Sequence, residues 1–492
     1  MFSRPPPPPA RTRSALLLPV LFILVACSDA PPGQEVASGI TEGVWVMEAD
    51  PDRFLWEFTH SESGLSCSVH VLQGGVKLNE MPCRTSELDG LEVTVSMDTG
   101  VTLEGEVDLN RGRIRGHLVG PDGSRNPVEL NSGSPDDYPF LTARVGAEGP
   151  YTYRIPTDIG DGWPVGDATS VGIQPAALEE LVAAVDRGEF GVLHSLLVAR
   201  HGRLVLEEYF HGYDQQDLHH LASVTKSVSS LLIGLAIQEG SMPGVDTKLL
   251  SFFPGAENTA AEGWEALTLE DLLTMSLALD WSPQEADNLH GTGPEFFHKV
   301  LSRSVVGMPG RDFQYVSANV NLIAGILHQT TGSHAEAFAE RALFGPLGIR
   351  RWDWTGRKTE GYNLMDGSLR LVPRDMAKLG QMALGGGQWN GAQVVAQDWI
   401  HQATSTQIQA TLGLEEVGSE GYGYLWWTLE IPGPEGTPLP VFFANGWGSQ
   451  FIIGFPTLDL LVVTTGGNEY NGKHMSVGEG ILLYLLPAIQ VN

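Results

Sequence analysis

The sequence predicts a mixed α/β protein, in which an antiparallel sheet is flanked by helices with a helical insert and is preceded by a small all-β domain. Residues 40–135 alternate apolar and polar side chains in short runs, as half-buried strands do. Residues 151–492 place strand-like runs near both ends and amphipathic helices between them. The 492-residue chain is 42% hydrophobic and 18% charged, with 59 Gly and 31 Pro, which excludes fibrous and disordered classes.

Residues 1–26 are predicted to be a cleaved signal peptide. Three arginines precede a single apolar run at 15–26, which is short for a membrane span of about 20 residues and ends at Cys27. A cysteine at the cleavage point resembles bacterial lipoproteins. That resemblance implies a lipid on Cys27 and, because Ser28 follows, sorting to the outer membrane. We therefore expect an anchored protein of the cell envelope that faces the periplasm, with an ordinary secretory signal as the alternative.

The net charge argues against nucleic-acid partners. The formal charge is −30, and removal of the signal takes away three arginines and no acidic residue, which gives −33 for the mature chain. A surface this acidic repels phosphate backbones. The acidity names no substrate, because an acidic surface also simply keeps a protein soluble.

After a Pro- and Gly-rich linker at 27–39, the region 40–135 is predicted to be a small β-sandwich or barrel. Runs near 65–71, 91–97 and 101–109 each place apolar side chains on one face, and turn signals separate them about every ten residues. Apart from Cys27, the cysteines of the chain are Cys67 and Cys83. In an oxidising compartment such a pair favours a disulfide over a metal or redox site, and we expect it to tie a strand to the following loop.

The domain at 151–492 begins with a Gly-, Asp- and Pro-rich connection. Residues 196–206 are predicted to form a hairpin around His201 and Gly202, and residues 451–463 form a second one around Pro456. Strands at both ends with helices between them indicate one antiparallel sheet assembled from the two ends of the domain.

A Ser-x-x-Lys motif opens the first long helix of this domain. Apolar residues at 228, 231, 232 and 235 follow helical spacing, so Ser223 lies at or near the helix N-terminus and Lys226 lies one turn later on the same face. A serine is a weak nucleophile until a base takes its proton, and a lysine in a suitable environment can be that base. The structural alternative is a serine N-cap followed by a solvated lysine.

Tyr315 is a second candidate, in a loop just before a helix predicted at 320–329. A tyrosine presented at a loop edge can relay protons to Ser223 and Lys226. The structural alternative is an ordinary core or surface tyrosine.

Five short segments, taken in order, resemble the serine β-lactamase-related superfamily and most of all its 6-aminohexanoate-dimer hydrolase and carboxylesterase branch. They are Ser223-x-x-Lys226, Asp271-Leu272-Leu273-Thr274-Met275, Tyr315-x-Ser317, Pro373-Arg374-Asp375-Met376 and Asn445-Gly446-Trp447-Gly448-Ser449-Gln450. The resemblance covers 151–492 and implies a β-lactamase-like fold for that part. It does not cover the β-rich N-terminal region.

The resemblance implies a role for each matching residue. Ser223 would be the acylated nucleophile, Lys226 its activating base, and Tyr315 the group that protonates the leaving group. The oxyanion hole would combine the Ser223 N–H with one N–H from the edge at Gly446 to Ser449, Trp447 being the first choice. Gly446 and Gly448 would flank it.

Two departures from the penicillin-recognising pattern bear on the substrate. Those enzymes have Asn two residues after the tyrosine, where this chain has Ser317, with Asn319 close behind. They also carry Lys-Thr-Gly on the strand beside the nucleophile to hold a substrate carboxylate, whereas this chain has Asn-Gly-Trp-Gly at 445–448. A neutral, aromatic edge thus replaces a cation.

We therefore expect a lipid-anchored serine hydrolase that acts on a small-molecule ester or amide. The enzymatic alternative is a β-lactamase or D-alanyl peptidase, and the non-enzymatic one is a surface module whose β-domain binds a partner. No Gly-x-Ser-x-Gly, His-Glu-x-x-His or Cys-x-x-Cys motif occurs, so neither a metal nor a cofactor is expected.

Overall fold

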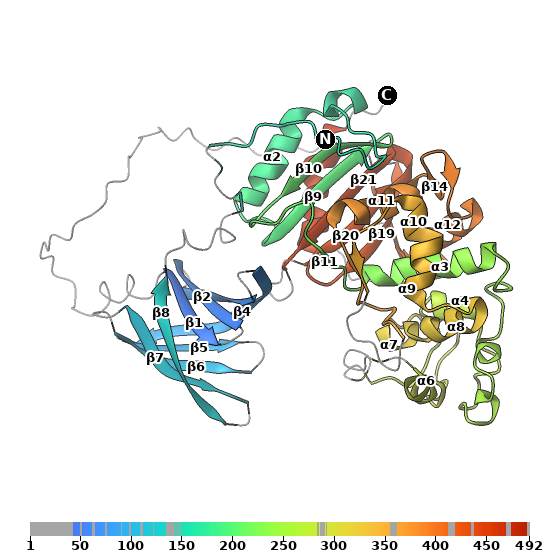
Figure 1. The fold of residues 1–492 in the computed structure, drawn as a ribbon, viewed down its shortest axis with the longest axis horizontal. Helices are drawn as coiled ribbons and strands as arrows, with labels where there is room; N and C mark the ends of the chain where they lie inside the picture. Colours follow the sequence, from blue (N-terminus) through green and yellow to red (C-terminus); the bar gives the residue numbers. More distant parts are fainter. Residues whose placement is uncertain are drawn as a thin grey trace, which may run out of the picture.

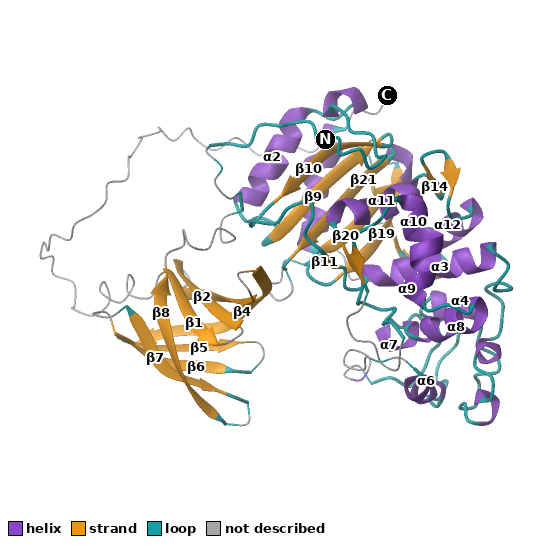
Figure 2. Ribbon diagram, in the orientation of Figure 1, coloured by secondary structure: helices purple, strands orange, loops and turns teal. Residues whose placement is uncertain are grey.

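A computed structural model describes most of the chain from residue 43 onward (Figures 1 and 2). The described residues are 43–49, 52–61, 64–73, 76–89, 91–97, 100–108, 112–121, 123–133, 143–144, 147, 149–282, 285, 291, 293–354, 362–411, 419–433, 437–468 and 474–489. The predicted signal peptide, Cys27 and the linker at 27–39 lie outside them.

The N-terminal region is a closed antiparallel barrel of eight strands in sequence order. The strands are β1 (Gly43–Ala49), β2 (Asp52–Ser61), β3 (Gly64–Gln73), β4 (Val76–Asp89), β5 (Glu92–Met97), β6 (Thr102–Asp108), β7 (Arg113–Val119) and β8 (Arg125–Gly133). Pairing of β1 with β8, with Val44 opposite Gly133, closes the barrel. Alternate side chains such as Val93, Val95 and Leu103 are fully buried, as the period of two predicted.

A disulfide links Cys67 in β3 to Cys83 in β4. We expected the bridge to run from a strand to the following loop, and this detail is wrong. The segment after β3 continues as a long strand that pairs with β3, so Ser68 lies opposite Pro82 and the two cysteines are neighbours across the pair. The disulfide therefore joins two adjacent strands of the barrel.

The second region is built on an eight-stranded antiparallel sheet in the order β10-β9-β21-β20-β19-β18-β17-β16. Its strands are β9 (Leu193–Arg200), β10 (Arg203–Tyr209), β16 (Ile408–Gln409), β17 (Ser419–Tyr422), β18 (Trp427–Pro432), β19 (Pro438–Gly446), β20 (Gln450–Phe455) and β21 (Leu460–Gly466). Figure 1 shows the green N-terminal hairpin beside the red C-terminal one, because β9 pairs with β21. The prediction of one sheet assembled from both ends of the domain is confirmed.

Helices cover both faces of this sheet (Figure 2). Helix α11 (Pro373–Leu384) packs on one face, where a side chain at Gly380 would meet Ile452. Helix α13 (Ser476–Leu485) lies on the other face, where Gly478 is next to Ile453, the neighbouring residue of β20. Every residue of β9 and β21 is buried as a result.

Among the other helices, α2 packs on α13 and α3 is buried. The remaining ones make up the helical insert. In chain order, these other helices are α2 (Pro175–Asp186), α3 (Val224–Gln238), α4 (Leu269–Leu273), α6 (Pro294–Leu301), α7 (Ser317–Val320), α8 (Leu322–Thr331), α9 (Ala335–Ala339), α10 (Gly345–Leu347) and α12 (Gln397–Ala403). Short strands complete the set: β11 (His219–His220), β12 (Trp352–Asp353), β13 (Arg370–Leu371), β14 (Gln388–Trp389) and β15 (Ala392–Gln393). None of the helices found in the described ranges has the length and apolar character needed to cross a membrane.

Candidate active site

Ser223 is the N-cap of α3, which begins at Val224 as the motif predicted. Its side chain makes no capping hydrogen bond, unlike an ordinary serine N-cap. The preceding residue, Ala222, has a φ of 45°, a left-handed conformation that costs a residue with a Cβ roughly 1–2 kcal/mol. Such strain is typical of functional sites, and here it lies immediately before the candidate nucleophile.

Lys226 points back along α3 to Ser223. Its Nζ donates to Ser223 Oγ at 2.7 Å and to the backbone carbonyl of Asp366 at 2.8 Å. The lysine is only 1% exposed, because the whole first part of α3 is buried. A solvated lysine, the structural alternative, is therefore excluded. Asp366 is a contact that the motif could not reveal, since it acts through its backbone.

The loop that carries Asp366 is fixed to the helices beside it. The N–H of Met365 donates to Asn321 Oδ1 at 2.7 Å, and its carbonyl accepts from Ser229 Oγ at 2.8 Å. Ser229 lies one turn beyond Lys226 on α3. These contacts hold the Asp366 carbonyl where the lysine amine meets it.

Tyr315 lies in the loop that leads into α7, with its ring 5.1 Å from Lys226 Nζ. The ring also stacks on Trp427 of β18, with centroids 5.6 Å apart and planes at 24°. Tyr422 packs edge-on against the Tyr315 ring, and burial together with the nearby Tyr315 raises the pKa of Tyr422 well above its usual value. The structure thus brings together the serine, the lysine and the tyrosine that the sequence singled out.

The edge at Gly446 to Ser449 lies beside the start of α3. A Cβ on Gly446, the last residue of β19, would lie 2.3 Å from the carbonyl oxygen of Leu221 and 3.2 Å from Val224. Only glycine permits this approach. Trp447, the next residue, is 52% exposed, and Gly448 adopts a φ of 86°.

The two secondary candidates have different surroundings. Ser317 is the first residue of α7 and is partly exposed. Asn319 is 3% exposed, and its Oδ1 accepts a hydrogen bond from the indole N–H of Trp281 at 3.0 Å. The guanidinium of Arg303 covers the face of that indole. The Asn319 side chain therefore bonds the segment that follows α4.

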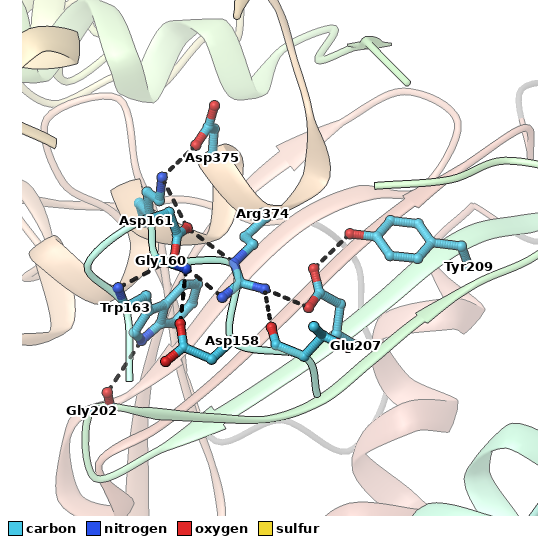
Figure 3. Close-up of polar contacts among 11 residues, drawn as sticks. Asp158, Gly160, Asp161, Trp163, Gly202, Glu207, Tyr209, Arg374 and Asp375 are labelled. Carbon is cyan, nitrogen blue, oxygen red and sulfur yellow. Dashed lines mark hydrogen bonds and ion pairs between the residues drawn. The ribbon is translucent and has the colours of Figure 1, made fainter. Parts of the chain in front are cut away.

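The segment Pro373–Met376 forms a buried ion network at the start of α11 (Figure 3). Arg374 is 2% exposed and pairs with Asp161 at 3.0 Å and with Glu207 of β10 at 2.7 Å. Lys378 pairs with Asp375 at 2.7 Å and with Asp161 at 3.2 Å. These contacts connect α11 to β10 and to the connection that precedes α2, and none of them involves Ser223, Lys226 or Tyr315.

Burial and ion pairing oppose each other in this network. Burial raises the pKa of Glu207 and of Asp375, although cationic neighbours counteract it. The pKa of Asp161 is lowered, because the attraction of Lys378 and Arg374 outweighs its partial burial.

Sequence reasoning missed Asp366, Trp427 and His474 as parts of the site. Trp427 is only 6% exposed, like a core residue, yet its ring stacks on Tyr315. His474 accepts the Ser449 N–H, and no spacing signal pointed to it. Within the described ranges, no group of three or more His, Cys, Asp or Glu residues could hold a metal ion.

Comparisons with known proteins identify the family and the relatives of this chain. The Beta-lactamase family model matches residues 178–474. The chain is 24% identical over 253 residues to a 6-aminohexanoate-dimer hydrolase of Paenarthrobacter ureafaciens, a match that covers 47% of this chain and 63% of that protein. The match therefore spans somewhat less than two thirds of the relative's length.

Solved structures show the same fold. A Bacillus anthracis protein assigned as a 6-aminohexanoate-dimer hydrolase has a TM-score of 0.50 at 19% identity, covering 61% of this chain and 80% of its own. EstCE1, a hydrolase with promiscuous acyltransferase activity, has a TM-score of 0.51 at 15% identity, covering 66% of this chain and all of its own. The predicted fold class, with a β-lactamase-like sheet flanked by helices, is confirmed.

Proposed function

The chain belongs to the beta-lactamase family of serine hydrolases, and on that premise we propose that it cleaves an ester or amide through an acyl-enzyme formed on Ser223. One observation carries the proposal. The Lys226 amine, buried and bonded to Ser223 Oγ at 2.7 Å, also lies over the ring of Tyr315. Ser223 would be the nucleophile, Lys226 the base within hydrogen-bond distance of it, and Tyr315 the group beside that base. Nucleophilic catalysis requires these parts.

In the proposed reaction, Lys226 takes the proton of Ser223 as Oγ attacks the substrate carbonyl carbon. The carbonyl π bond breaks and its electron pair moves to oxygen, which gives a tetrahedral oxyanion. Collapse of this intermediate breaks the bond to the leaving group, and Tyr315 supplies the proton that the leaving group needs. Water then attacks the acyl-enzyme with the same groups acting in reverse and restores Ser223.

The oxyanion is proposed to be stabilised by the N–H of Ser223 and an N–H of the Gly446–Ser449 turn, Trp447 being the first choice. The close approach of Gly446 to Leu221 supports this placement. The N–H of Ser449 is already donated to His474, so it is not the second donor. The N-terminus of α3 adds positive potential at the same place.

The chemistry of the Gly446–Ser449 turn favours a substrate that is not recognised through a carboxylate. Residues 445–448 carry no cation, Tyr315 stacks on Trp427, and the Trp447 side chain is exposed on the turn. A short-acyl ester or a linear amide fits this edge. The name of the Paenarthrobacter relative, a 6-aminohexanoate-dimer hydrolase, supports the amide bond alone, because that dimer ends in a carboxylate for which residues 445–448 offer no cation.

An active-site serine probe tests the proposal. We expect a fluorophosphonate to label the mature protein and to leave Ser223→Ala unlabelled, with hydrolysis of a short-acyl nitrophenyl ester lost in the same variant. Competition with esters, linear amides, D-amino-acid peptides and penicillins then ranks the substrate classes. Unchanged ester hydrolysis in Ser223→Ala would refute the role of Ser223, and a wild type that neither reacts nor turns over would favour a non-catalytic module.

A β-lactamase or D-alanyl peptidase activity is the second candidate, and the family match to beta-lactamases is what favours it. Incubation with penicillin distinguishes it from the first. A stable penicilloyl adduct on Ser223, seen as a shift in intact mass, would support the second candidate. Hydrolysis of the penicillin without an adduct would support its β-lactamase form, and an unmodified protein that leaves the penicillin intact and still hydrolyses the ester would support the first.

A further inference from the structure

The turn between β19 and β20 is fastened through one residue, Ser449. This residue is fully buried and has a φ of 70°, a left-handed conformation that persists only where its surroundings impose it. Its carbonyl accepts from Thr464 Oγ1 at 2.9 Å, and its Oγ accepts from Asn468 Nδ2 at 3.0 Å. These two partners lie on β21 and just after it.

His474 holds Ser449 by accepting a hydrogen bond from the backbone N–H of Ser449. Ser449 N donates to His474 Nδ1 at 3.0 Å, and Ser449 Oγ donates to the His474 carbonyl at 3.1 Å. The imidazole stacks on Phe451, with planes at 17°, and is tilted against Trp447. The ring therefore lies between the exposed tryptophan of the turn and the first part of β20.

The imidazole accepts this bond only in its neutral form, with the proton on Nε2. Burial lowers the pKa of His474 to about 4, so the ring is neutral at physiological pH and Nδ1 is free to accept. The bond also occupies the Ser449 N–H, so this N–H is not a donor to the oxyanion.

The exact place of this turn matters for the chemistry. Gly446 approaches the Leu221 carbonyl so closely that a Cβ would lie 2.3 Å from it, so the turn and the segment before Ser223 are in direct contact. Oxyanion donors act only within about 2.7–3.1 Å of the developing charge, and a misplacement of about 1 Å can cost roughly a hundredfold in rate.

We propose that His474 is a positioning residue, which holds the Gly446–Ser449 turn against the start of α3 by accepting the N–H of Ser449. The proposal deepens the function proposed above and rests on it. His474 touches no reacting atom, and it acts through the turn that carries the oxyanion donor.

Three variants separate the hydrogen bond from the packing of the ring. His474→Phe keeps a ring on Phe451 and removes the acceptor. His474→Asn keeps an acceptor oxygen close to the place of Nδ1 and removes the ring, and His474→Leu has the shape of Asn without the acceptor. The readouts are kcat and KM for a short-acyl ester, together with hydrogen exchange of the Ser449 amide.

We expect the Phe and Leu variants to lose about a hundredfold in kcat with little change in KM, the size typical of a misplaced oxyanion donor. Their Ser449 amide should exchange faster than in the wild type. His474→Asn should keep kcat within a few-fold of the wild type and keep the amide protected. If His474→Phe fails to fold, as its melting curve would show, the Leu and Asn pair gives the same comparison.

Two results would overturn the role of His474: full kcat in a variant without an acceptor, or a loss in His474→Asn as large as that in His474→Leu. Failure of the proposed function has a different signature. The wild type itself would then neither hydrolyse the ester nor react with the serine probe, while the exchange of the Ser449 amide would still report whether His474 holds the turn.

Discussion

Two buried lysines of this chain have different partners, and the difference supports the role proposed for Lys226. Lys378 meets the carboxylates of Asp375 and Asp161, so its charge is neutralised by permanent partners. Lys226 instead meets the hydroxyl of Ser223 and the carbonyl of Asp366. A lysine bonded to a hydroxyl and a carbonyl can give up and regain a proton without breaking an ion pair, which is what a general base requires.

Replacement of Tyr315 by Phe tests the proton donor with little change in packing. The ring keeps its contacts with Lys226 and Trp427, so we expect the melting temperature to stay within a few degrees of the wild type. Turnover of an alkyl ester or amide should fall by about 10²–10⁴-fold, the usual contribution of general acid catalysis. A nitrophenyl ester, whose leaving group needs no proton, should lose much less. Equal losses on both substrates would contradict the assignment.

His219 predicts a pH dependence of stability. Burial lowers its pKa to about 4, and its Nδ1 is bonded to the Asp217 carbonyl at 3.1 Å. Since the unfolded chain takes up the proton first, at a pKa of about 6.5, the free energy of unfolding should fall as the pH drops from about 6.5 to 4, by up to about 1.4 kcal/mol per unit. His219→Asn keeps a donor for Asp217 and does not titrate. Urea denaturation at several pH values in this range gives the free energy of unfolding, which should depend less steeply on pH in the variant than in the wild type. The same dependence on pH in both proteins would refute the prediction.

At the scale of helices and strands, the sequence predicted the elements whose residues are close together in the chain. The turn at His201 and Gly202 and the helix after Ser223 depend on local spacing, and both lie where they were expected. The pairing of β9 with β21 followed from the position of apolar strands at both ends of the domain.

Contacts that depend on the backbone or on tertiary packing were not predictable. The Asp366 carbonyl bonds Lys226 whatever its side chain, so its residue type carries no signal. Trp427 is buried like any core residue, and only the fold reveals that one face of its ring supports Tyr315. Cys83 was placed in a loop because residues 76–89 lack clear alternation, yet they form a long strand that pairs on both sides.

The buried ion network of α11 leads to a prediction at the same scale. Arg374→Met leaves the buried carboxylate of Glu207 without its cationic partner and leaves Asp161 with Lys378 alone, and the loss of a partner from a buried ion pair typically costs about 3–5 kcal/mol. The double variant with Glu207→Gln should lose less than the sum of the two single variants, since both act on one pair. Urea denaturation measures the three values. Strict additivity would show that the contact contributes nothing to stability.

At the scale of the whole molecule, the chain has two separate hydrophobic cores. One lies inside the barrel and includes Trp56 and Val95, and the other lies around the large sheet and includes Leu197 and Val462. The two cores share none of the described residues. We therefore expect two unfolding transitions in calorimetry. Cys67→Ala combined with Cys83→Ala should lower the free energy of unfolding of the barrel by about 3 kcal/mol for a loop of this length. Only the calorimetric transition of the barrel should therefore move to lower temperature. A matched shift of both transitions would show that the two cores unfold as one unit.

The charge of the whole molecule bears on how it would reach a membrane. At −33 after removal of residues 1–26, the mature chain is repelled by anionic headgroups, so a lipid on Cys27 is the proposed attachment. The wild type should therefore stay with the membrane fraction in molar salt and leave it in detergent, and mass spectrometry of its N-terminal peptide should show the added acyl mass. Cys27→Ser should appear in the soluble fraction with unchanged ester hydrolysis, because residue 27 is remote in sequence from Ser223 and Lys226. Release of the wild type by salt, or membrane retention of Cys27→Ser, would show that attachment depends on something other than this lipid.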